Sequence, residues 1–162
     1  MSRESALSSK TLDANWKLIS DSPLRPEELL AQARNPASGA LVLFSGEARN
    51  HNRGRPVLGL EYEVYKPMAE KHIRRIVADA LERWELNFAA CVHRAGRTEV
   101  LESAVVVVTS SAHRSEAYEA NRYIIDRVKH EVPIWKKELY ADGESVWSEN
   151  CENCSHPSHT SP

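Results

Sequence analysis

The chain has 162 residues, with 21 basic and 23 acidic side chains and a formal net charge of −2. This length allows one domain with its own core, and the balanced charge argues against nucleic acid or an anionic membrane as general partners. No apolar run approaches the roughly 20 residues that span a bilayer, and the N-terminal residues lack the apolar core of a signal peptide. We therefore expect a cytoplasmic protein.

The two ends differ in composition from the rest of the chain. Residues 1–12 are polar and aperiodic, and residues 150–162 are rich in Ser, Pro, His and Cys. Segments of this kind bury little apolar surface and tend to stay disordered. We expect a single domain over residues 13–149, between a disordered N-terminus and a flexible C-terminal tail.

Helix and strand patterns follow one another along the expected domain. Pro26 begins a short helix that Asn35-Pro36 ends. Residues 39–46 are typical of a buried strand, residues 58–64 alternate with period two, and we expect these two strands to pair. Pro67 begins the clearest helix of the chain, because apolar residues recur there at the spacing of one helical face. These residues are Ile73, Ile76, Val77, Ala80, Leu81 and Trp84.

The second half of the expected domain continues the mixed pattern. Residues 88–92 and 104–108 indicate two more strands, the second of them β-branched and covered on both faces. A second long helix is expected from about 115 to 130, and Pro133 prevents its continuation. Asp142-Gly143 is a strong turn signal, so the domain should end in a hairpin. Together these elements favour an α+β fold with a mainly antiparallel sheet and helices on one face.

Positively charged side chains gather in four clusters beside the expected elements. Loops and element ends are where a rigid scaffold presents functional side chains, and several cations meeting there could hold a multiply charged substrate. The clusters are Arg49 to Arg55, His93-Arg94 with Arg97, His113-Arg114, and Lys129 with Lys136 and Lys137.

Each of the first clusters also has a purely structural interpretation. The loop from Arg49 to Arg55 is rich in turn formers and could be only a solvated hairpin loop, and His93-Arg94 could simply end a strand. His113 falls on the apolar side of the second long helix, as a buried core histidine would. Lys129 in the last helical turn could serve only to offset the helix dipole.

Lys136 is the least easily explained by structure alone. It follows an apolar extended stretch, Pro133-Ile134-Trp135, that should carry it partly into the protein, with Lys137 pointing the other way. Desolvation and nearby positive charge would then favour the neutral amine, which is the form that acts as a base or nucleophile.

The remaining chemistry-bearing residues receive no catalytic assignment. Three carboxylates lack a partner at a spacing that sequence can verify, so we expect exposed ion pairing for Glu63, Asp126 and Glu138. Cys91 is expected in the core. The tail, Cys151-x-x-Cys154-x-His156-x-x-His159, holds four potential zinc ligands. One residue between the second cysteine and the first histidine is not the spacing of structural zinc, so we expect no metal.

Five motifs resemble, in order and approximate spacing, the family of molybdopterin synthase large, catalytic subunits. The resemblance covers about residues 39 to 147, and five motifs in register are specific where one would be weak. The motifs are Phe44-x-Gly46-x-x-Arg49 with Gly54, Leu60-Glu61-Tyr62-Glu63-x-Tyr65-x-x-Met68-Ala69, His93-Arg94-x-Gly96, His113-Arg114-x-x-Ala117-Tyr118, and Lys129-x-x-x-Pro133-Ile134-Trp135-Lys136-x-Glu138.

The resemblance implies an α/β-hammerhead fold and a heterotetramer, in which a central dimer of large subunits carries a small ubiquitin-like subunit at each end. In the family, the small subunit's C-terminal Gly-Gly tail bears a thiocarboxylate, enters a pocket of the large subunit and gives sulfur to cyclic pyranopterin monophosphate. Two rounds build the dithiolene of molybdopterin during molybdenum cofactor biosynthesis. The implied activity is a sulfurtransferase that needs no cofactor or metal.

Five residues of this chain match the family's pocket residues. The resemblance makes Lys129 and Lys136 the catalytic candidates, and it makes Arg49, His113 and Arg114 the groups that hold the phosphate and the incoming tail. The phosphate, the thiocarboxylate and the charge that develops on its carbonyl are all negative, so preorganised cations would stabilise each of them. Arginine suits the phosphate because its planar fork donates two parallel hydrogen bonds, whereas lysine can exchange a proton.

Two alternatives stay open from the residues alone. The cationic clusters could belong to a non-catalytic module that binds a phosphorylated ligand or RNA. The net charge and the lack of aromatic residues interleaved with basic ones disfavour RNA. The other alternative is a metal-binding interaction protein that uses the C-terminal tail.

Overall fold

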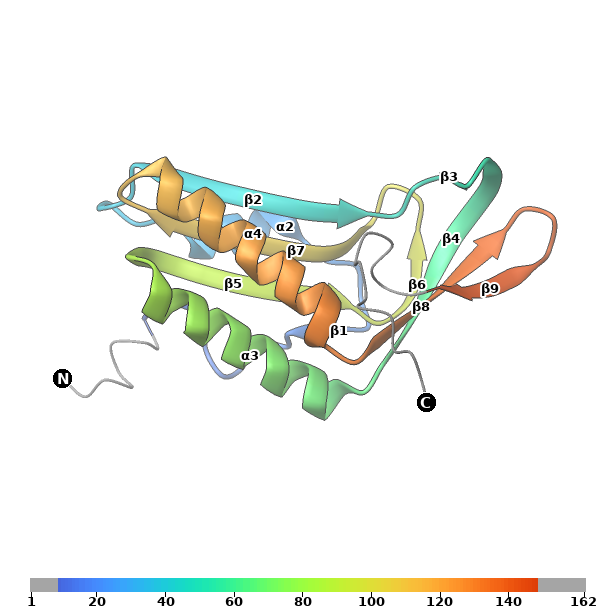
Figure 1. The fold of residues 1–162 in the computed structure, drawn as a ribbon, viewed down its shortest axis with the longest axis horizontal. Helices are drawn as coiled ribbons and strands as arrows, with labels where there is room; N and C mark the ends of the chain where they lie inside the picture. Colours follow the sequence, from blue (N-terminus) through green and yellow to red (C-terminus); the bar gives the residue numbers. More distant parts are fainter. Residues whose placement is uncertain (1–8, 149–162) are drawn as a thin grey trace, which may run out of the picture.

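The computed structural model describes residues 9–148 and arranges them in two β-sheets and three helices (Figure 1). The first sheet has four strands. Their order is β1 (Ile19–Ser20), β5 (Leu86–Arg94), β7 (Ser103–Ser111) and β2 (Ala40–Glu47). β1 runs parallel to β5, and the other neighbours in this sheet are antiparallel.

The second sheet has five antiparallel strands and forms the right-hand side of Figure 1. Its main path is β3 (His51–Asn52), β4 (Arg55–Val64), β8 (Ile134–Tyr140) and β9 (Ser145–Ser148), and β6 (Gly96–Glu99) also pairs with β4. The expected mainly antiparallel α+β fold is therefore confirmed, with the strands divided between two sheets.

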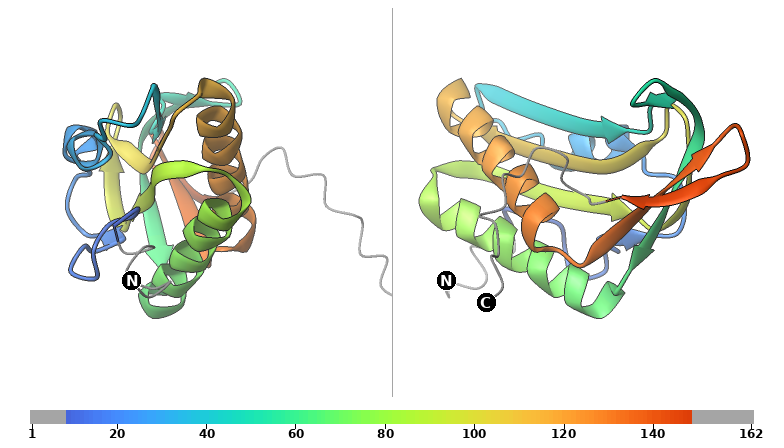
Figure 2. Two further views of the ribbon diagram at one scale, coloured as in Figure 1. Left: turned by 90° about the vertical axis from the view of Figure 1, so that its left-hand side faces the viewer. Right: turned by 45° about the vertical axis from the view of Figure 1, so that its right-hand side comes forward.

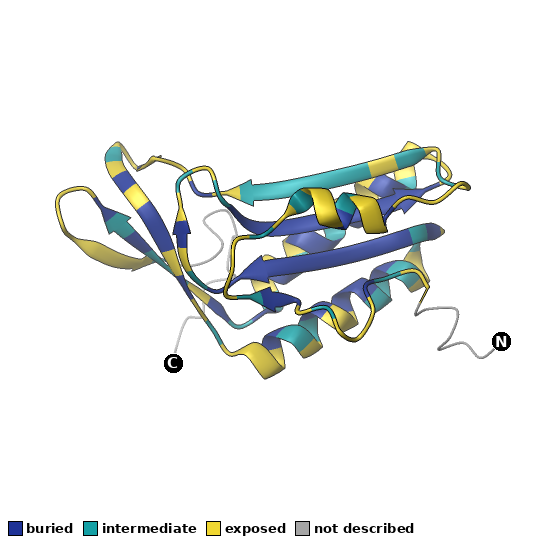
Figure 3. Ribbon diagram, turned by 180° about the vertical axis from the view of Figure 1, so that it is seen from behind, coloured by how far each residue is buried: buried dark blue, intermediate teal, exposed yellow. Residues whose placement is uncertain are grey.

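The helices cover the first sheet. α3 (Lys66–Arg83) and α4 (Arg114–Glu131) lie side by side on one face, and the short α2 (Pro26–Gln32) lies on the other face against β2 and β7 (Figures 1 and 2). All nine residues of β7 are buried, as the view from behind also shows (Figure 3). β7 has strands on both edges and helices over both faces, which confirms the expectation of a covered strand.

Apolar residues on one side of each long helix form the core against this sheet. Their spacing confirms the two predicted helical faces. The buried residues are Ala69, Ile73, Ile76, Val77 and Ala80 in α3, and Ala117, Ala120, Ile124 and Val128 in α4.

One predicted strand pairing is wrong. Residues 39–46 were expected to pair with residues 58–64, but β2 pairs with β7 along its whole length, and β4 pairs with β8 and β6. The turn between them explains the difference. Arg53 and Gly54 have positive φ angles of 48° and 77°, and they fold β3 back onto the first residues of β4. This short hairpin directs β4 into a different sheet from β2.

The predicted C-terminal hairpin is confirmed. β8 and β9 are antiparallel neighbours joined by a turn in which Gly143 has a φ of 90°, a conformation that favours glycine. Within the turn, the Asp142 carboxylate accepts a hydrogen bond from the Glu144 amide at 3.0 Å. This hairpin projects from the body of the protein (Figure 2).

One of the three cysteines lies within the described residues. Cys91 is buried in the core as predicted, and burial raises the pKa of its thiol to about 12, so the thiol is protonated at neutral pH. The predicted tail ligands Cys151, Cys154, His156 and His159 lie outside the described residues.

Within residues 9–148, no helix is long and apolar enough to cross a membrane.

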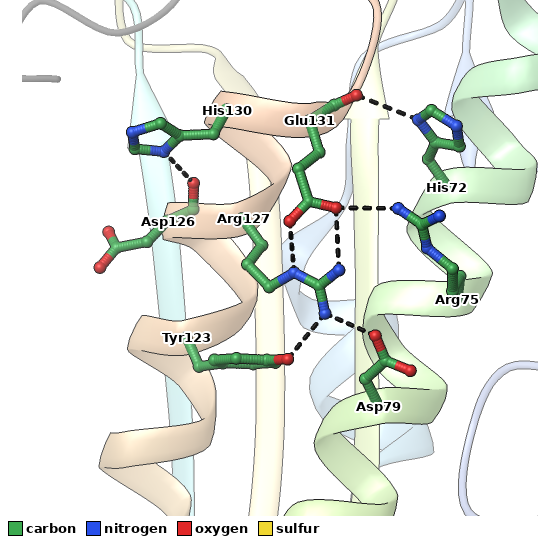
Figure 4. A network of polar contacts seen from close by, with 8 residues as sticks. All are labelled: His72, Arg75, Asp79, Tyr123, Asp126, Arg127, His130 and Glu131. Carbon is green, nitrogen blue, oxygen red and sulfur yellow. Dashed lines mark hydrogen bonds and ion pairs between the residues drawn. The ribbon is translucent and has the colours of Figure 1, made fainter. Parts of the chain in front are cut away.

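A network of polar contacts fixes the C-terminal half of α4 to α3 (Figure 4). Arg127 donates through Nε and Nη2 to the two carboxylate oxygens of Glu131, at 2.5 and 2.8 Å. Its Nη1 donates to Asp79 of α3 at 2.5 Å, and Arg75 of α3 donates to Glu131 at 2.9 Å. Lys129 lies two residues beyond Arg127, about 200° around the helix, and therefore faces away from this clamp.

Replacing Arg127 by glutamine should lower the free energy of unfolding by about 1–3 kcal/mol, because two carboxylates lose charge-assisted hydrogen bonds. Urea unfolding followed by circular dichroism measures this. Arg122→Gln is the matched control on the same helix, since Arg122 is 85% exposed and pairs with Asp126 one turn away. Equal losses in the free energy of unfolding for the two variants would contradict a stabilising role for the Arg127 network.

Candidate active site

A cavity of about 690 Å³ opens beside the C-terminal half of α4, and strands of both sheets contribute to it. This volume suits one small-molecule ligand. Its apolar lining consists of Phe44, Val57, Leu60, Ala104, Val105, Ile125 and Val128. Its polar lining includes Glu47, Arg49, His51, Asn52, Tyr62, His93, Arg122, Asp126, Lys129, His130, Lys136 and Glu138.

Three of the five predicted site residues line this cavity together. Arg49 comes from the connection after β2, Lys129 from the last turn of α4, and Lys136 from β8. Arg49 is 80 residues away from Lys129 in the sequence, and the fold brings it to the two lysines because β2, β8 and the end of α4 meet there. The lining as a whole holds four Lys and Arg side chains and three carboxylates, a slight excess of positive charge.

The other two predicted site residues lie elsewhere on this chain. His113 is the N-cap residue of α4 and Arg114 is its first residue, and both line a separate depression with Tyr118 and Glu119. Fifteen residues of helix separate Arg114 from Lys129, a rise of about 22 Å along the axis. His113 is exposed, so the alternative of a buried core histidine is wrong.

Lys136 occupies the position that the sequence predicts. Its side chain is only 14% exposed, and its Nζ lies 3.5 Å from Oε1 of Glu138. Lys137 points to the opposite face of the sheet, where its ammonium lies 5.4 Å from the ring centroid of Trp147. The expectation of one partly buried lysine beside an outward-facing one is confirmed.

Glu138 is a buried carboxylate, so the prediction of an exposed ion pair for this residue is wrong. Only 4% of its side chain is exposed. Its Oε2 accepts hydrogen bonds from the Asn52 amide at 2.6 Å and from the Tyr140 hydroxyl. Together with Lys136, three donors therefore surround this carboxylate.

These donors decide the ionisation of Glu138. Burial alone would raise its pKa, but the hydrogen bonds from Tyr140 and Asn52 and the charge of Lys136 outweigh burial and lower the pKa below its ordinary value. The shared hydrogen bond raises the pKa of Tyr140, which keeps its hydroxyl as the donor. At neutral pH, the cavity thus presents an ionised carboxylate next to Lys136.

Other residues of the predicted cationic clusters serve the scaffold. Arg55 lies 3.8 Å over the ring of Tyr140 and donates to the carboxylates of Asp142 and Glu144 at 2.6 and 2.7 Å, which ties β4 to the C-terminal hairpin. Arg94 is buried and donates to the backbone carbonyls of Ser20, Ala95 and Arg97. The structural interpretation of Arg94 is therefore correct.

Glu138, His93 and Asn52 line the cavity but were not predicted as site residues, and the sequence carried a signal for the first of them. Alternate residues of a strand share a face, so placing Lys136 inward also places Glu138 and Tyr140 inward. The sequence marked His93 through a cationic cluster and a family motif but did not predict its burial in the cavity, because β5 shows no alternation and all nine of its residues except Asn87 are buried. Asn52 lies in a two-residue strand that follows a turn-rich loop.

The cavity combines groups that bind negative charge with groups that can exchange a proton. Arginine and lysine side chains suit a phosphate or a carboxylate, and the Lys136–Glu138 pair sits in partly desolvated surroundings. No set of three or more His, Cys, Asp or Glu side chains among residues 9–148 is placed to hold a metal ion. The fold and the cavity are those of a protein whose side chains suit a phosphorylated or carboxylate ligand and include groups capable of acid–base chemistry.

Comparisons with known proteins identify the family. The family model described as MoaE protein matches residues 19–131. The molybdopterin synthase catalytic subunit of Bacillus subtilis is 40% identical over 139 residues, which cover 86% of this chain and 88% of the relative. That of Bos taurus is 43% identical over 129 residues, which cover 80% and 68%. The crystal structure of molybdopterin synthase from Staphylococcus aureus matches with a TM-score of 0.75 and 40% identity, over 80% of this chain and 94% of that chain.

The chain belongs to the MoaE family of molybdopterin synthase catalytic subunits, which are enzymes. The family predicted from the five motifs is therefore confirmed.

Proposed function

We propose that this chain transfers sulfur from the C-terminal thiocarboxylate of a small ubiquitin-like subunit to cyclic pyranopterin monophosphate, and that the reaction takes place in the cavity described above. The observation that carries this proposal is the meeting of Arg49, Lys129 and Lys136 at one cavity. Together with the family, this supports molybdopterin formation as the activity. The cytoplasmic location expected from the sequence is part of the proposal.

The charges of the cavity suit each group that the reaction brings into it. Arg49 is exposed beside the cavity and can bind the phosphate with its planar fork. Lys129 and Lys136 can stabilise the thiocarboxylate and the charge that develops on its carbonyl as sulfur leaves. They can also transfer protons while sulfur attacks the pterin side chain and the cyclic phosphate opens. Glu138 keeps Lys136 directed into the cavity through their 3.5 Å contact.

His113 and Arg114 require a second copy of the chain if they act on the same substrate. They lie about 22 Å of helix away from Lys129, and they line a separate depression and not the cavity of their own chain. The resemblance predicts a homodimer of large subunits within a heterotetramer. We therefore assign these two residues to the cavity of the partner copy, where they would add cations for the phosphate and the incoming tail.

Mixed dimers test this assignment. One copy would carry His113→Ala and Arg114→Ala, the other Lys136→Ala, and two different affinity tags would isolate the mixed dimer. If cavities are shared between copies, one cavity of the mixed dimer is complete and activity returns to about half of the wild-type value, although each variant alone is inactive. A mixed dimer as inactive as its parents would show that the residues do not act across copies.

Reconstitution tests the function itself. The purified chain, a thiocarboxylated small subunit that ends in Gly-Gly, and cyclic pyranopterin monophosphate should yield molybdopterin, measured after oxidation to a fluorescent pterin. Removing the two terminal glycines of the small subunit should abolish both product and complex. A chain that binds the pterin but forms no product with an intact thiocarboxylated partner would instead support the non-catalytic binding module.

A further inference from the structure

His93 is a buried titratable group in the cavity that the proposed sulfur transfer does not use. It lies at the end of β5, 3% exposed, and lines the cavity together with Tyr62 and Lys129. The rings of Tyr62 and His93 meet edge to face, with centroids 5.0 Å apart. This packing holds the imidazole in one orientation.

One nitrogen of His93 is already occupied. Its Nδ1 lies 2.8 Å from the backbone carbonyl oxygen of Arg94. A carbonyl oxygen can only accept, so Nδ1 carries the hydrogen, and in the neutral ring Nε2 has a lone pair. Burial lowers the pKa of His93 to about 4, the Arg94 hydrogen bond opposes this shift, and the charge of Lys129 adds to it. His93 is therefore a neutral hydrogen-bond acceptor at physiological pH.

Three side chains of this cavity are buried, uncharged and able to accept a hydrogen bond: Asn52, Tyr62 and His93. Lysine and arginine can only donate, and Glu138 already receives hydrogen bonds or charge from Asn52, Tyr140 and Lys136. Glu47 and Asp126 are exposed. The Nε2 atom of His93 can only accept, because Nδ1 holds the ring hydrogen, whereas the Asn52 amide and the Tyr62 hydroxyl also donate.

The apolar lining lies in the same cavity. Val57, Leu60, Val105, Ile125 and Val128 are all buried, and each contributes apolar surface to the cavity. Such surface suits a flat ring system better than it suits a phosphate. The N–H groups of a heteroaromatic ring would lose their hydrogen bonds to water in these surroundings unless a buried acceptor replaced them.

We propose that His93 determines the specificity for the pterin ring by accepting a hydrogen bond at Nε2 from a ring N–H group. The ring then lies against the apolar lining, and the phosphate lies toward Arg49 and Lys129. This inference rests on the proposed function, and it adds the orientation of the substrate. This role requires a neutral imidazole, because a protonated ring has no nitrogen left to accept a hydrogen bond.

Binding measurements separate recognition of the ring from recognition of the phosphate. The assembled enzyme, with a small subunit that carries a carboxylate instead of a thiocarboxylate, would be titrated calorimetrically with cyclic pyranopterin monophosphate and with inorganic phosphate. His93→Leu should weaken pterin binding about tenfold or more and leave phosphate binding unchanged. His93→Gln retains a neutral acceptor and should stay within about threefold of wild type. Unchanged pterin binding by a folded His93→Leu enzyme would overturn the proposal.

A second measurement on the wild-type enzyme does not depend on the folding of a variant. In protein labelled with ¹⁵N-histidine, long-range ¹H–¹⁵N spectra identify the ring nitrogen that carries the proton. We expect the Nδ1–H form, and we expect the Nε2 resonance to move when the pterin is added but not when phosphate is added. An Nε2 resonance that the bound pterin leaves unmoved would reject His93 as the acceptor. A wild-type enzyme that neither binds nor converts the pterin would reject the proposed function instead.

Discussion

Replacing Lys136 by alanine should reduce molybdopterin formation at least about 100-fold while the protein remains folded. A positioned proton-transfer group typically contributes a factor of this size, and Lys136 also supplies positive charge in partly desolvated surroundings. Glu138 keeps its hydrogen bonds from Asn52 and Tyr140 in this variant, so the local structure should persist. Product formation under single-turnover conditions, together with a circular dichroism spectrum, measures both effects.

Lys137→Ala is the matched control, because Lys137 is the next residue of the same strand and faces the opposite side of the sheet. It should retain nearly wild-type activity. Lys136→Arg distinguishes charge from proton transfer, since arginine keeps the charge but does not release a proton near neutral pH. Near-normal product yield from Lys136→Ala would remove this lysine from the mechanism.

Replacing Glu138 by glutamine should lower both stability and activity. The change leaves Lys136 without its counter-charge in a site where little water can compensate. The carboxylate of Glu138 accepts from Asn52 and Tyr140 and lies beside Lys136. A glutamine amide has one accepting oxygen, and its NH₂ group would be a further donor among these donors. We expect a loss of about 2–3 kcal/mol in the free energy of unfolding, which lowers Tm by roughly 5–10 °C for a protein of this size. Differential scanning calorimetry gives the value.

The stability effect of Glu138 should depend on pH in a defined direction. Its folded-state pKa is lowered, so its contribution is present above the unfolded-state pKa, which is about 4.3 for glutamate, and is lost as pH falls through the folded-state pKa. The difference in Tm between wild type and Glu138→Gln should therefore shrink below about pH 4. Glu61→Gln, on the exposed face of β4, is the control and should show no such trend. If the difference in Tm between wild type and Glu138→Gln grew toward acid pH, the stabilising role of the ionised Glu138 carboxylate would be contradicted.

Local patterns predicted the long helices and the C-terminal hairpin because their signals are short-range. The helical face of α3 follows from residues three and four apart, and Asp142-Gly143 specifies its turn within a few residues. The pairing of β2 with β7 could not be read in this way. The two strands are more than fifty residues apart, and the choice between β7 and β4 depends on the turn at Arg53 and Gly54.

The candidate site divides along the same line. The motifs that the chain shares with its family marked Arg49, Lys129 and Lys136, and the apolar stretch before Lys136 predicted its partial burial. The burial of Glu138 follows from its alternation with Lys136 along β8. The burial of His93 came only from the folded structure, because it depends on which distant segments cover the residue. The separation of His113 from Lys129 follows from the length of α4, a helix that the sequence had already predicted.

The sequence by itself determined the family, the two long helices, the terminal hairpin and the residue types needed to hold an anionic substrate. Each of these depends on residues that are close together in the sequence or on the order of motifs along the chain, and both can be seen without a structure. Only the tertiary structure decided which cations share a cavity and which histidine is kept neutral. These properties arise from contacts between distant segments, and the low dielectric around a buried group then sets its charge.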